Sequence, residues 1–218
     1  MTYTNTEENY IKAIYHLEHE HESVGTNLLS AAMQTKPASV TDMLKKLEAK
    51  KLLHYEKYRG FRLSDQGNKL ALTIIRKHRL WEYFLVEKLG FNWDEVHVLA
   101  EQLEHVSSED LISRLDEFLE HPAFDPHGDP IPDVKGKFRK INQDNLLGLP
   151  LKKNLKVSAV KNQETEMLNL LTQYEIKIGT QLKILRRFAY DGSVEIRIEK
   201  NAATILSKQV AQHIYCNL

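Results

Sequence analysis

Three prolines between Phe124 and Asp133 divide this chain into two parts with different hydrophobic periodicities. Proline lacks a backbone donor and clashes with the preceding helical turn, so no helix continues through this segment. Before it, apolar residues recur every three to four positions, as in helices, whereas runs after residue 154 alternate apolar and polar residues, as in strands. We therefore predict a mainly α protein with small β elements, in which the helices precede a small C-terminal β-barrel.

The composition narrows the class of protein. With 218 residues, 42% of them hydrophobic, the chain can bury the cores of one to three domains. The N-terminus lacks the pattern of a signal peptide, and no run approaches the ~18 apolar residues of a membrane span, so we expect a cytoplasmic protein without membrane contact. Cys216 is the single cysteine, which excludes an intrachain disulfide and a cysteine metal cluster. Nitrogen and oxygen ligands must therefore hold any metal ion.

The charges are segregated along the chain, although the formal net charge is zero. Residues 36–79 contain twelve Lys and Arg against four Asp and Glu, residues 80–133 two against fourteen, and residues 134–218 fifteen against seven. A basic segment beside an acidic one is typical of a nucleic-acid contact surface joined to a cation-binding domain. The competing interpretation is that these runs are solvated faces.

The first 50 residues predict a helix-turn-helix. Residues 6–20 have helical periodicity, Thr26 caps a short helix that ends near Met33, and a second helix covers residues 38–50. Its small polar residues would approach base edges and its lysines would meet phosphates. The candidate DNA-binding residues are Thr26, Lys36, Pro37, Ala38, Ser39, Thr41, Asp42, Lys45 and Lys46. The alternative is an ordinary amphipathic helical hairpin.

A predicted β-hairpin argues against that alternative. Residues 52–63 form two β-like runs that reverse around Arg59-Gly60, directly after the second helix. This order makes a winged helix over residues 1–72. Lys57 and Arg59 at the hairpin tip would contact the backbone or minor groove of a DNA duplex.

A second, helical domain is predicted over residues 73–140. The helix over residues 68–89 has more apolar residues than one packing stripe requires, which suggests a dimer interface. Another helix carries His97, and a third covers residues 111–119. Residues 141–154 are predicted as a linker, and residues 155–218 as the barrel, with strands at 155–157, 181–185 and 193–199.

The helical domain contains a candidate metal site. His97, Glu101, Glu104 and His105 fall within roughly 100° of one helix face, and His78 and Glu82 are four residues apart on the preceding helix. Carboxylates on one face repel one another, whereas a divalent cation would stabilise them. The alternative is an acidic exposed helix with two incidental histidines.

Six segments of the chain are similar to one family. They are Thr6-Glu-Glu-Asn-Tyr-Ile, Lys36-Pro-Ala-Ser-Val-Thr, Tyr55-Glu-Lys-Tyr-Arg-Gly, Arg76-Lys-His-Arg-Leu, Glu101-x-x-Glu104-His105-Val and Gly128-Asp-Pro-Ile-Pro. Over essentially its full length the chain resembles the diphtheria toxin repressor and manganese transport regulator family of metal-dependent bacterial repressors. The resemblance implies an N-terminal winged helix, a central dimerisation and metal domain, and a C-terminal SH3-like (FeoA-like) barrel.

The resemblance also implies a set of metal ligands. They are Asn9, His78, Glu82, His97, Glu101, Glu104, His105 and, from the barrel, Glu164. Iron-responsive members have cysteine where Glu101 stands, and oxygen ligation suits Mn²⁺, so Mn²⁺ is preferred over Fe²⁺, with Zn²⁺, Co²⁺ or Cd²⁺ as substitutes. Asn9 and Lys12 stand where some manganese-responsive members have carboxylates, and Met167 stands where the family barrel has glutamine.

The leading functional hypothesis is a homodimeric repressor of metal-uptake genes that binds a double-stranded operator when Mn²⁺ or Fe²⁺ is present. One alternative is a metallohydrolase built on Glu101-x-x-Glu104-His105, but an inverted zincin motif needs histidine at position 101. We therefore do not expect an enzyme. A further alternative is a winged-helix regulator whose metal site is purely structural.

Overall fold

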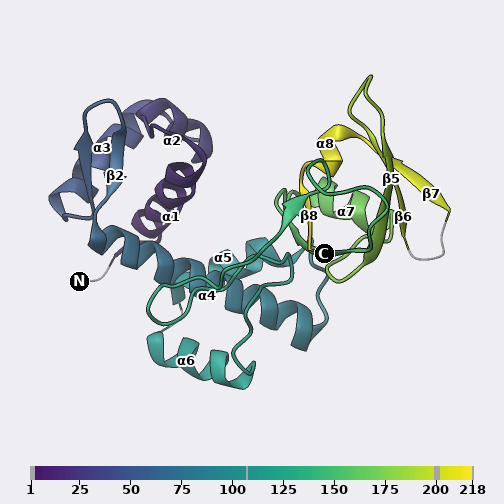
Figure 1. Ribbon diagram of the computed structural model, residues 1–218. Coiled ribbons are helices and arrows are strands. Elements are labelled where there is room, and N and C mark those ends of the chain that lie inside the picture. Colours follow the sequence, from purple (N-terminus) through teal and green to yellow (C-terminus); the bar gives the residue numbers. More distant parts are fainter. Residues whose placement is uncertain (1–2, 107, 199–201, 218) are drawn as a thin grey trace.

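The N-terminal unit is a winged helix, as the sequence predicts (Figure 1). The computed structural model describes residues 3–106, 108–198 and 202–217. The elements of this unit are α1 (Asn5–Glu20), α2 (Thr26–Ala32), α3 (Pro37–Ala49), β1 (Leu53–Glu56) and β2 (Gly60–Leu63). Its core consists of apolar side chains from all three helices and the hairpin, among them Ile11, Leu29, Leu44 and Leu63. Because α3 buries Val40, Leu44 and Leu47, its other face is left exposed.

The start of α2 differs from the prediction. Gly25, and not Thr26, is the N-cap, and no side chain accepts a hydrogen bond from the first helical turn. Thr26 is the first residue of the helix instead. The preceding residue explains this shift, since Val24 pairs with the wing: its N–H donates to Arg59 O (3.1 Å) and its carbonyl accepts from Phe61 N (2.9 Å). The segment before α2 is therefore fixed by the hairpin rather than by a capping side chain.

Glu7 is a buried charge within the winged helix. Its Oε1 accepts hydrogen bonds from Lys50 Nζ (2.6 Å) and contacts Lys46 Nζ (3.1 Å), while Oε2 accepts from Thr4 N (2.9 Å). Burial alone would raise the pKa of this carboxyl, but the two lysines and the Thr4 N–H outweigh it and lower the pKa to about 2. The ionised carboxylate thus joins α1 to α3.

We expect Glu7→Gln to destabilise the protein at pH 7 by roughly 2 kcal/mol, because a carboxyl with a depressed folded-state pKa stabilises the fold when ionised. This contribution is complete above the unfolded-state pKa of 4.5 and is lost as the pH falls towards about 2. Urea unfolding of both proteins between pH 7 and pH 3 measures the difference. A gap in free energy that does not narrow with acidification would contradict this explanation.

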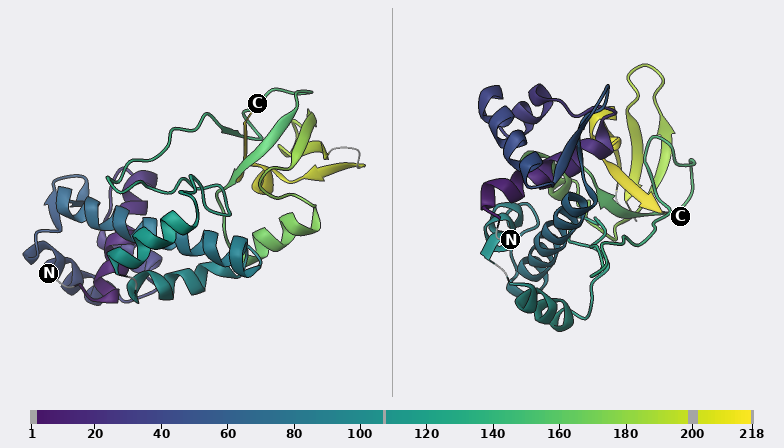
Figure 2. Two further views of the ribbon diagram at one scale, coloured as in Figure 1. Left: turned by 90° about the horizontal axis from the view of Figure 1, so that it is seen from below. Right: turned by 90° about the vertical axis from the view of Figure 1, so that its left-hand side faces the viewer.

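The central unit is built on one long helix that also belongs to the N-terminal core. Helix α4 (Asp65–Leu89) starts three residues earlier than predicted, because Ser64 Oγ caps it by accepting from Gly67 N (3.1 Å). Ala71 of α4 packs in the winged-helix core, whereas Leu80 and Leu85 pack against α6 (Glu109–Phe118) and α5 (Val96–Val106). Figure 2 shows α4 running from the N-terminal helices towards the C-terminal unit.

The C-terminal unit is a six-stranded antiparallel sheet, which confirms the predicted SH3-like fold class. The strand order is β3-β8-β4-β5-β6-β7. The elements are β3 (Asp144–Asn145), β4 (Leu155–Val160), α7 (Thr165–Gln173), β5 (Gln181–Arg187), β6 (Val194–Ile198), β7 (Ala203–Leu206), α8 (Lys208–Ala211) and β8 (Ile214–Asn217). Its core includes Val157, Leu168, Ile184 and Ile196. No helix among the described residues is long and apolar enough to cross a membrane.

The C-terminal unit corrects several details of the prediction. The expected linker 141–154 contains β3, which pairs with β8, and Leu146 and Leu149 of this segment are buried in the barrel core. They stand in the short run Leu146-Leu-Gly-Leu-Pro-Leu151, which Gly148 and Pro150 interrupt, so the run shows no helix or strand periodicity. Helix α7 and strands β7 and β8 were also not predicted. The expected strand at 193–199 is β6, and Glu199 lies outside the described residues.

Candidate metal centre and DNA-binding face

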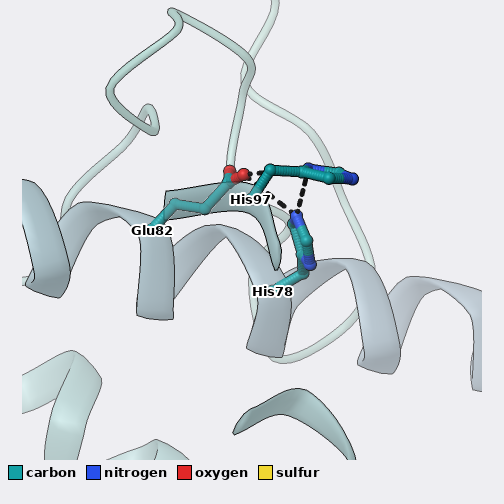
Figure 3. A group of neighbouring side chains, drawn as sticks. All are labelled: His78, Glu82 and His97. Carbon is teal, nitrogen blue, oxygen red and sulfur yellow. Dashed lines mark hydrogen bonds and ion pairs between the residues drawn. The ribbon is translucent and has the colours of Figure 1, made fainter. Parts of the chain in front are cut away.

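His78, Glu82 and His97 converge on one point between α4 and α5 (Figure 3). His78 and Glu82 occupy successive turns of α4, so their side chains lie side by side, and His78 Nε2 is 3.0 Å from Glu82 Oε1. His97, near the start of α5, brings its Nδ1 to 3.3 Å from the same carboxylate oxygen and 3.1 Å from His78 Nε2. Three predicted ligands therefore come together. Glu82 is buried, whereas the side chain of His97 is 54% exposed.

A second carboxylate fixes the orientation of His78. Its Nδ1 donates a hydrogen bond to Glu104 Oε2 (2.6 Å), which directs Nε2 towards Glu82. Burial alone would lower the pKa of His78, but Glu82 and Glu104 outweigh it and raise the pKa to about 9. An imidazole that donates to a carboxylate from one nitrogen and offers the other is the usual arrangement of a metal-binding histidine.

Asp125 and His127 complete this group, and sequence reasoning missed both. They lie in the proline segment, which α4 holds in place: Arg79 Nη1 donates to Pro130 O (2.6 Å) and Arg76 Nη1 to Pro132 O (2.7 Å). Asp125 Oδ1 in turn accepts from the backbone of the segment itself. With Glu82, these two residues form a second set of potential ligand atoms within 4.8 Å of one another. Their position beside Gly128-Asp-Pro was the available signal.

One nitrogen of His127 has the environment expected of a metal ligand. His127 Nε2 donates to the carbonyl of Trp93 (2.7 Å), so the neutral ring carries its lone pair on Nδ1. That Nδ1 is buried without a hydrogen-bond partner, 3.7 Å from Glu82 Oε2 and 3.9 Å from Asp125 Oδ1. Burial alone would lower the pKa of His127, but Glu82 and Asp125 outweigh it and raise the pKa to about 9, so this nitrogen carries a proton in the metal-free protein. A cation bound between the three residues would replace that proton. We call His78, Glu82, His97, Asp125 and His127 the Glu82 group.

A cavity of about 520 Å³ separates the Glu82 group from helix α1. Asn9 and Lys12 of α1 line it on one side, and Glu82 and His97 on another. The barrel contributes Gln163, whose Nε2 donates to Asp129 Oδ2 (3.0 Å). The resemblance implied Glu164 as a ligand, but this residue is exposed at the start of α7 and does not line the cavity. The neighbouring Gln163 lines the cavity instead. Met167 is buried in the barrel core.

The other predicted ligands form a second group between α1 and α5. Glu104 Oε1 accepts a hydrogen bond from Lys12 Nζ (2.6 Å), and Glu101 Oε1 lies 3.8 Å from the same ammonium. His105 Nδ1 donates to Glu8 Oε2 (2.6 Å). Asn9 Oδ1 and His105 Nε2 are buried without partners. We call this set the Glu104 group; it comprises Glu8, Asn9, Lys12, Glu101, Glu104 and His105, of which Glu8 and Lys12 were not predicted as site residues.

The predicted DNA-binding residues lie at the start of α2, in or directly before α3, and in the turn between β1 and β2. All are exposed except Thr26, which is half-buried. Several have partners within the protein: Lys46 contacts Glu7, Arg59 lies 3.9 Å from Glu56, the Lys57 ammonium lies over the Tyr58 ring, and Thr41 Oγ1 donates to Pro37 O (3.0 Å). Two exposed aromatic side chains of the wing, Tyr55 and Tyr58, were missed. The sequence feature that could have indicated them is the high density of aromatic residues in this short hairpin.

Family models match most of the chain. The model of the iron-dependent repressor N-terminal DNA-binding domain matches residues 2–61, and the model of the iron-dependent repressor metal-binding and dimerisation domain matches residues 64–133. A FeoA domain matches residues 145–218. These matches decide against the metallohydrolase alternative, because they describe domains of DNA-binding repressors rather than of enzymes.

Individual proteins agree with these matches. The iron-dependent repressor IdeR of Mycobacterium tuberculosis is 35% identical over 60% of this chain, which matches only 56% of that protein. The diphtheria toxin repressor of Corynebacterium glutamicum is 30% identical over 83% of this chain and 84% of its own length. A solved manganese-dependent transcriptional repressor in complex with manganese has a TM-score of 0.86 at 30% identity, covering 96% of this chain and 98% of that one. The chain therefore belongs to the diphtheria toxin repressor and manganese transport regulator family of metal-dependent transcriptional repressors.

Proposed function

We propose that this protein is a homodimeric repressor that binds a double-stranded operator when a divalent cation occupies the Glu82 group, and that its targets are metal-uptake genes. Residues 1–72 would supply the DNA-binding surface, and residues 73–140 the metal-binding and dimerisation surface. The observation that most supports this proposal is the buried Nδ1 of His127, which makes no hydrogen bond and lies 3.7 Å from Glu82 Oε2 and 3.9 Å from Asp125 Oδ1.

The chemistry of the donors favours Mn²⁺ as the physiological ion. The Glu82 group offers imidazole nitrogens and carboxylate oxygens, and its donor set contains no thiolate. Such ligands suit Mn²⁺ and Fe²⁺ better than softer ions, and geometry rather than raw affinity decides between metals. We propose Mn²⁺ as corepressor, with Fe²⁺ as the alternative, and Zn²⁺, Co²⁺ and Cd²⁺ as ions that can take its place in vitro.

The residues of the Glu82 group come from elements that also set the position of the DNA-binding unit. Helix α4 bears His78 and Glu82 and begins inside the winged-helix core. A bound cation would take the place of the protons on His78 and His127 as the counter-charge of Glu82. The surrounding chain holds these ligands through Glu104, which orients His78, and Arg79, which anchors the loop of His127. The same contacts would transmit the state of the site to α3.

A DNA-binding titration tests this function. Duplexes selected from a random library with the protein and Mn²⁺ would be titrated with Mn²⁺, Fe²⁺, Zn²⁺ and Co²⁺ under anaerobic conditions. We expect tight binding with Mn²⁺ and weak binding after chelation, since a ligand at 100 times its Kd shifts a two-state equilibrium about a hundredfold. Equal affinity for DNA in both states, together with a metal-dependent rise in thermal stability, would show that the metal is purely structural.

Exposed apolar residues on α6 support a dimer through the central unit. Leu111 and Phe118 are 43% and 62% exposed and lie two turns apart, at the edge of the apolar stripe that contains the buried Ile112 and Leu115. Phe118 packs edge-to-face with Phe84 of α4, at 6.4 Å between ring centroids. The buried part of this stripe packs inside the central unit, and its exposed edge is available to a second copy.

We expect Phe118→Glu to weaken dimerisation by about tenfold to a hundredfold, because it would place a charge in the interface. Sedimentation velocity over a range of concentrations measures the dimer Kd. The neighbouring exposed Glu117→Gln is the matched control and should leave the Kd unchanged. A Phe118→Glu protein that dimerises as tightly as the wild type would exclude this face as the interface.

A further inference from the structure

The Glu104 group already contains a cation from the chain itself. Lys12 extends from α1 to α5, where its ammonium hydrogen-bonds Glu104 and lies near Glu101. Its side chain is 14% exposed, and that of Glu104 is fully buried. Glu101 and Glu104 are two of the carboxylates to which the resemblance assigns a metal ion, so a lysine nitrogen occupies a place expected for such an ion.

We propose that Lys12 is a built-in competitor for divalent cations at the Glu104 group, which leaves the Glu82 group as the site that responds to metal at low concentration. This inference rests on the proposed function of the Glu82 group. A cation at the Glu104 group would have to displace the Lys12 ammonium from Glu104 Oε1 or share that oxygen with it.

The electrostatics of Glu104 support the competition. One carboxylate oxygen accepts from His78 Nδ1 and the other from Lys12 Nζ, both at 2.6 Å. Burial alone would raise the pKa of Glu104, but His78 and Lys12 outweigh it and lower the pKa, so the carboxylate is ionised and compensated without metal. An incoming divalent ion would therefore gain less from Glu104 and would be repelled by the ammonium.

The group nevertheless retains donor atoms that a cation could use. Asn9 Oδ1 and His105 Nε2 are both buried without a hydrogen-bond partner, and His105 Nε2 is 3.7 Å from Glu104 Oε1. Removing the positive charge of Lys12 would leave these donors beside two carboxylates without their counter-cation. The metal affinity of the Glu104 group is thus limited by the Lys12 ammonium, which a metal ion could displace, and not by the lack of a ligand.

Lys12 has a second consequence, because it joins two units of the chain. The Lys12–Glu104 contact links residues 92 positions apart, and the His105–Glu8 contact crosses the same gap between α1 and α5. These contacts hold the DNA-binding unit against the central unit without a metal ion. Part of the docking in this protein is therefore independent of metal.

Mn²⁺ binding isotherms, recorded by the electron paramagnetic resonance signal of the free ion, test the competition. The proteins are wild type, Lys12→Met and Lys12→Arg, each also in a Glu82→Gln background that weakens the Glu82 group. We expect Lys12→Met to raise the Mn²⁺ affinity of the Glu104 group at least about tenfold in that background, since a neighbouring unit charge is removed. Lys12→Arg, which keeps the charge, should behave like the parent protein.

The outcomes separate this inference from the proposed function. Superimposable isotherms for Lys12→Met and its parent in the Glu82→Gln background would overturn the inference. A Glu82→Gln protein that binds Mn²⁺ as tightly as wild type would instead refute the role of the Glu82 group. Exposed Lys183→Met, on the barrel, is the control for a general loss of charge.

Hydrogen exchange of the metal-free proteins tests the tether independently of metal. Lys12→Met should exchange the amides of α1 and α5 faster than wild type does, whereas Lys12→Arg should not, and circular dichroism verifies that each variant is folded. Unchanged exchange in a folded Lys12→Met protein would overturn the tethering role of Lys12.

Discussion

Glu82→Gln is expected to lower the affinity for Mn²⁺ by about a hundredfold or more and to abolish metal-dependent DNA binding at micromolar Mn²⁺. Glu82 is the one carboxylate shared by both sets of potential ligand atoms found among the described residues. Its Oε1 faces His78 and His97, and its Oε2 faces His127. The substitution keeps the shape of the side chain but removes its charge. The loss of Mn²⁺ affinity would therefore measure the contribution of that charge.

The metal-free protein should respond to the same substitution. Burial disfavours the charged form of His78 and of His127, and the Glu82 carboxylate contributes to raising both pKa values to about 9. Without that charge, both pKa values should fall towards the ordinary value of 6.5, which an NMR titration of the imidazoles would detect. Unshifted histidine pKa values would show that Glu82 does not set the electrostatics of this site.

Titration calorimetry with Mn²⁺ and fluorescence anisotropy of a labelled duplex provide the two main measurements for Glu82→Gln. Glu87→Gln is the matched control, because Glu87 is exposed on the same helix and lies outside both groups. It should bind Mn²⁺ and DNA like the wild type. If Glu82→Gln and Glu87→Gln were indistinguishable, the Glu82 group would not be the regulatory metal centre.

Gly128→Ala should destabilise the protein by on the order of 3 kcal/mol and weaken Mn²⁺ binding as well. Gly128 has a φ of +86°, and a Cβ there would lie 2.0 Å from Ser158 O and 2.6 Å from Ala159 Cα of β4. The clash is with backbone, which cannot rotate away. Next to it, the carbonyl of His127 accepts a hydrogen bond from Val160 N (2.9 Å), so the methyl group would push the His127 loop off the barrel.

Gly90→Ala is the control that separates backbone strain from this clash. Gly90, at the end of α4, has a φ of +74°, but a Cβ there would meet nothing within 4 Å. Its cost should be only about 1 kcal/mol, with Mn²⁺ affinity unchanged. Urea unfolding monitored by tryptophan fluorescence gives both values. Equal costs for the two variants would mean that contact between the loop and β4 contributes nothing to the fold.

The helical half of the molecule could be predicted because its signals are local. The spacing of His78 and Glu82 places both on one face of one helix, and the resemblance assigned His97 of the next helix to the same set of ligands. The winged helix is equally well marked, because two short helices and a hairpin around Gly60 follow in an order with few alternatives. In both cases the hydrophobic periodicity within a single segment predicts which face of that helix or strand is buried.

The rest of the site depends on contacts between distant segments. Asp125 and His127 lie in a loop without periodicity, and only the hydrogen bonds from Arg76 and Arg79 bring that loop to Glu82. The residue that the barrel contributes was also beyond prediction from local sequence. A shift of one position separates Gln163, which lines the cavity, from Glu164, which does not. Helical spacing predicted Glu101, Glu104 and His105, and the resemblance added Asn9, but only the structure shows that the ammonium of Lys12 lies among them.

The barrel was predicted least completely, for a related reason. Strands β3, β7 and β8 have only two to four residues each, so alternation cannot be recognised within them. They are stabilised by pairing with strands far away in the sequence, as β3 and β4 both pair with β8. The burial of Leu146 likewise depends on strands that come later in the chain.

Because α4 is continuous, a small rotation of this helix at Glu82 would cause a larger displacement at its N-terminal end. About 25 Å of rigid helix lies between Glu82 and the N-terminal end of α4, where the winged helix is attached. A rotation of about 7° at Glu82 would displace that end by about 3 Å, close to the rise of one base pair along DNA at about 3.4 Å. In a dimer both arms would swing, so their displacements would add. An angular adjustment of a few degrees around one carboxylate is thus large enough to take both recognition helices out of register with successive major grooves.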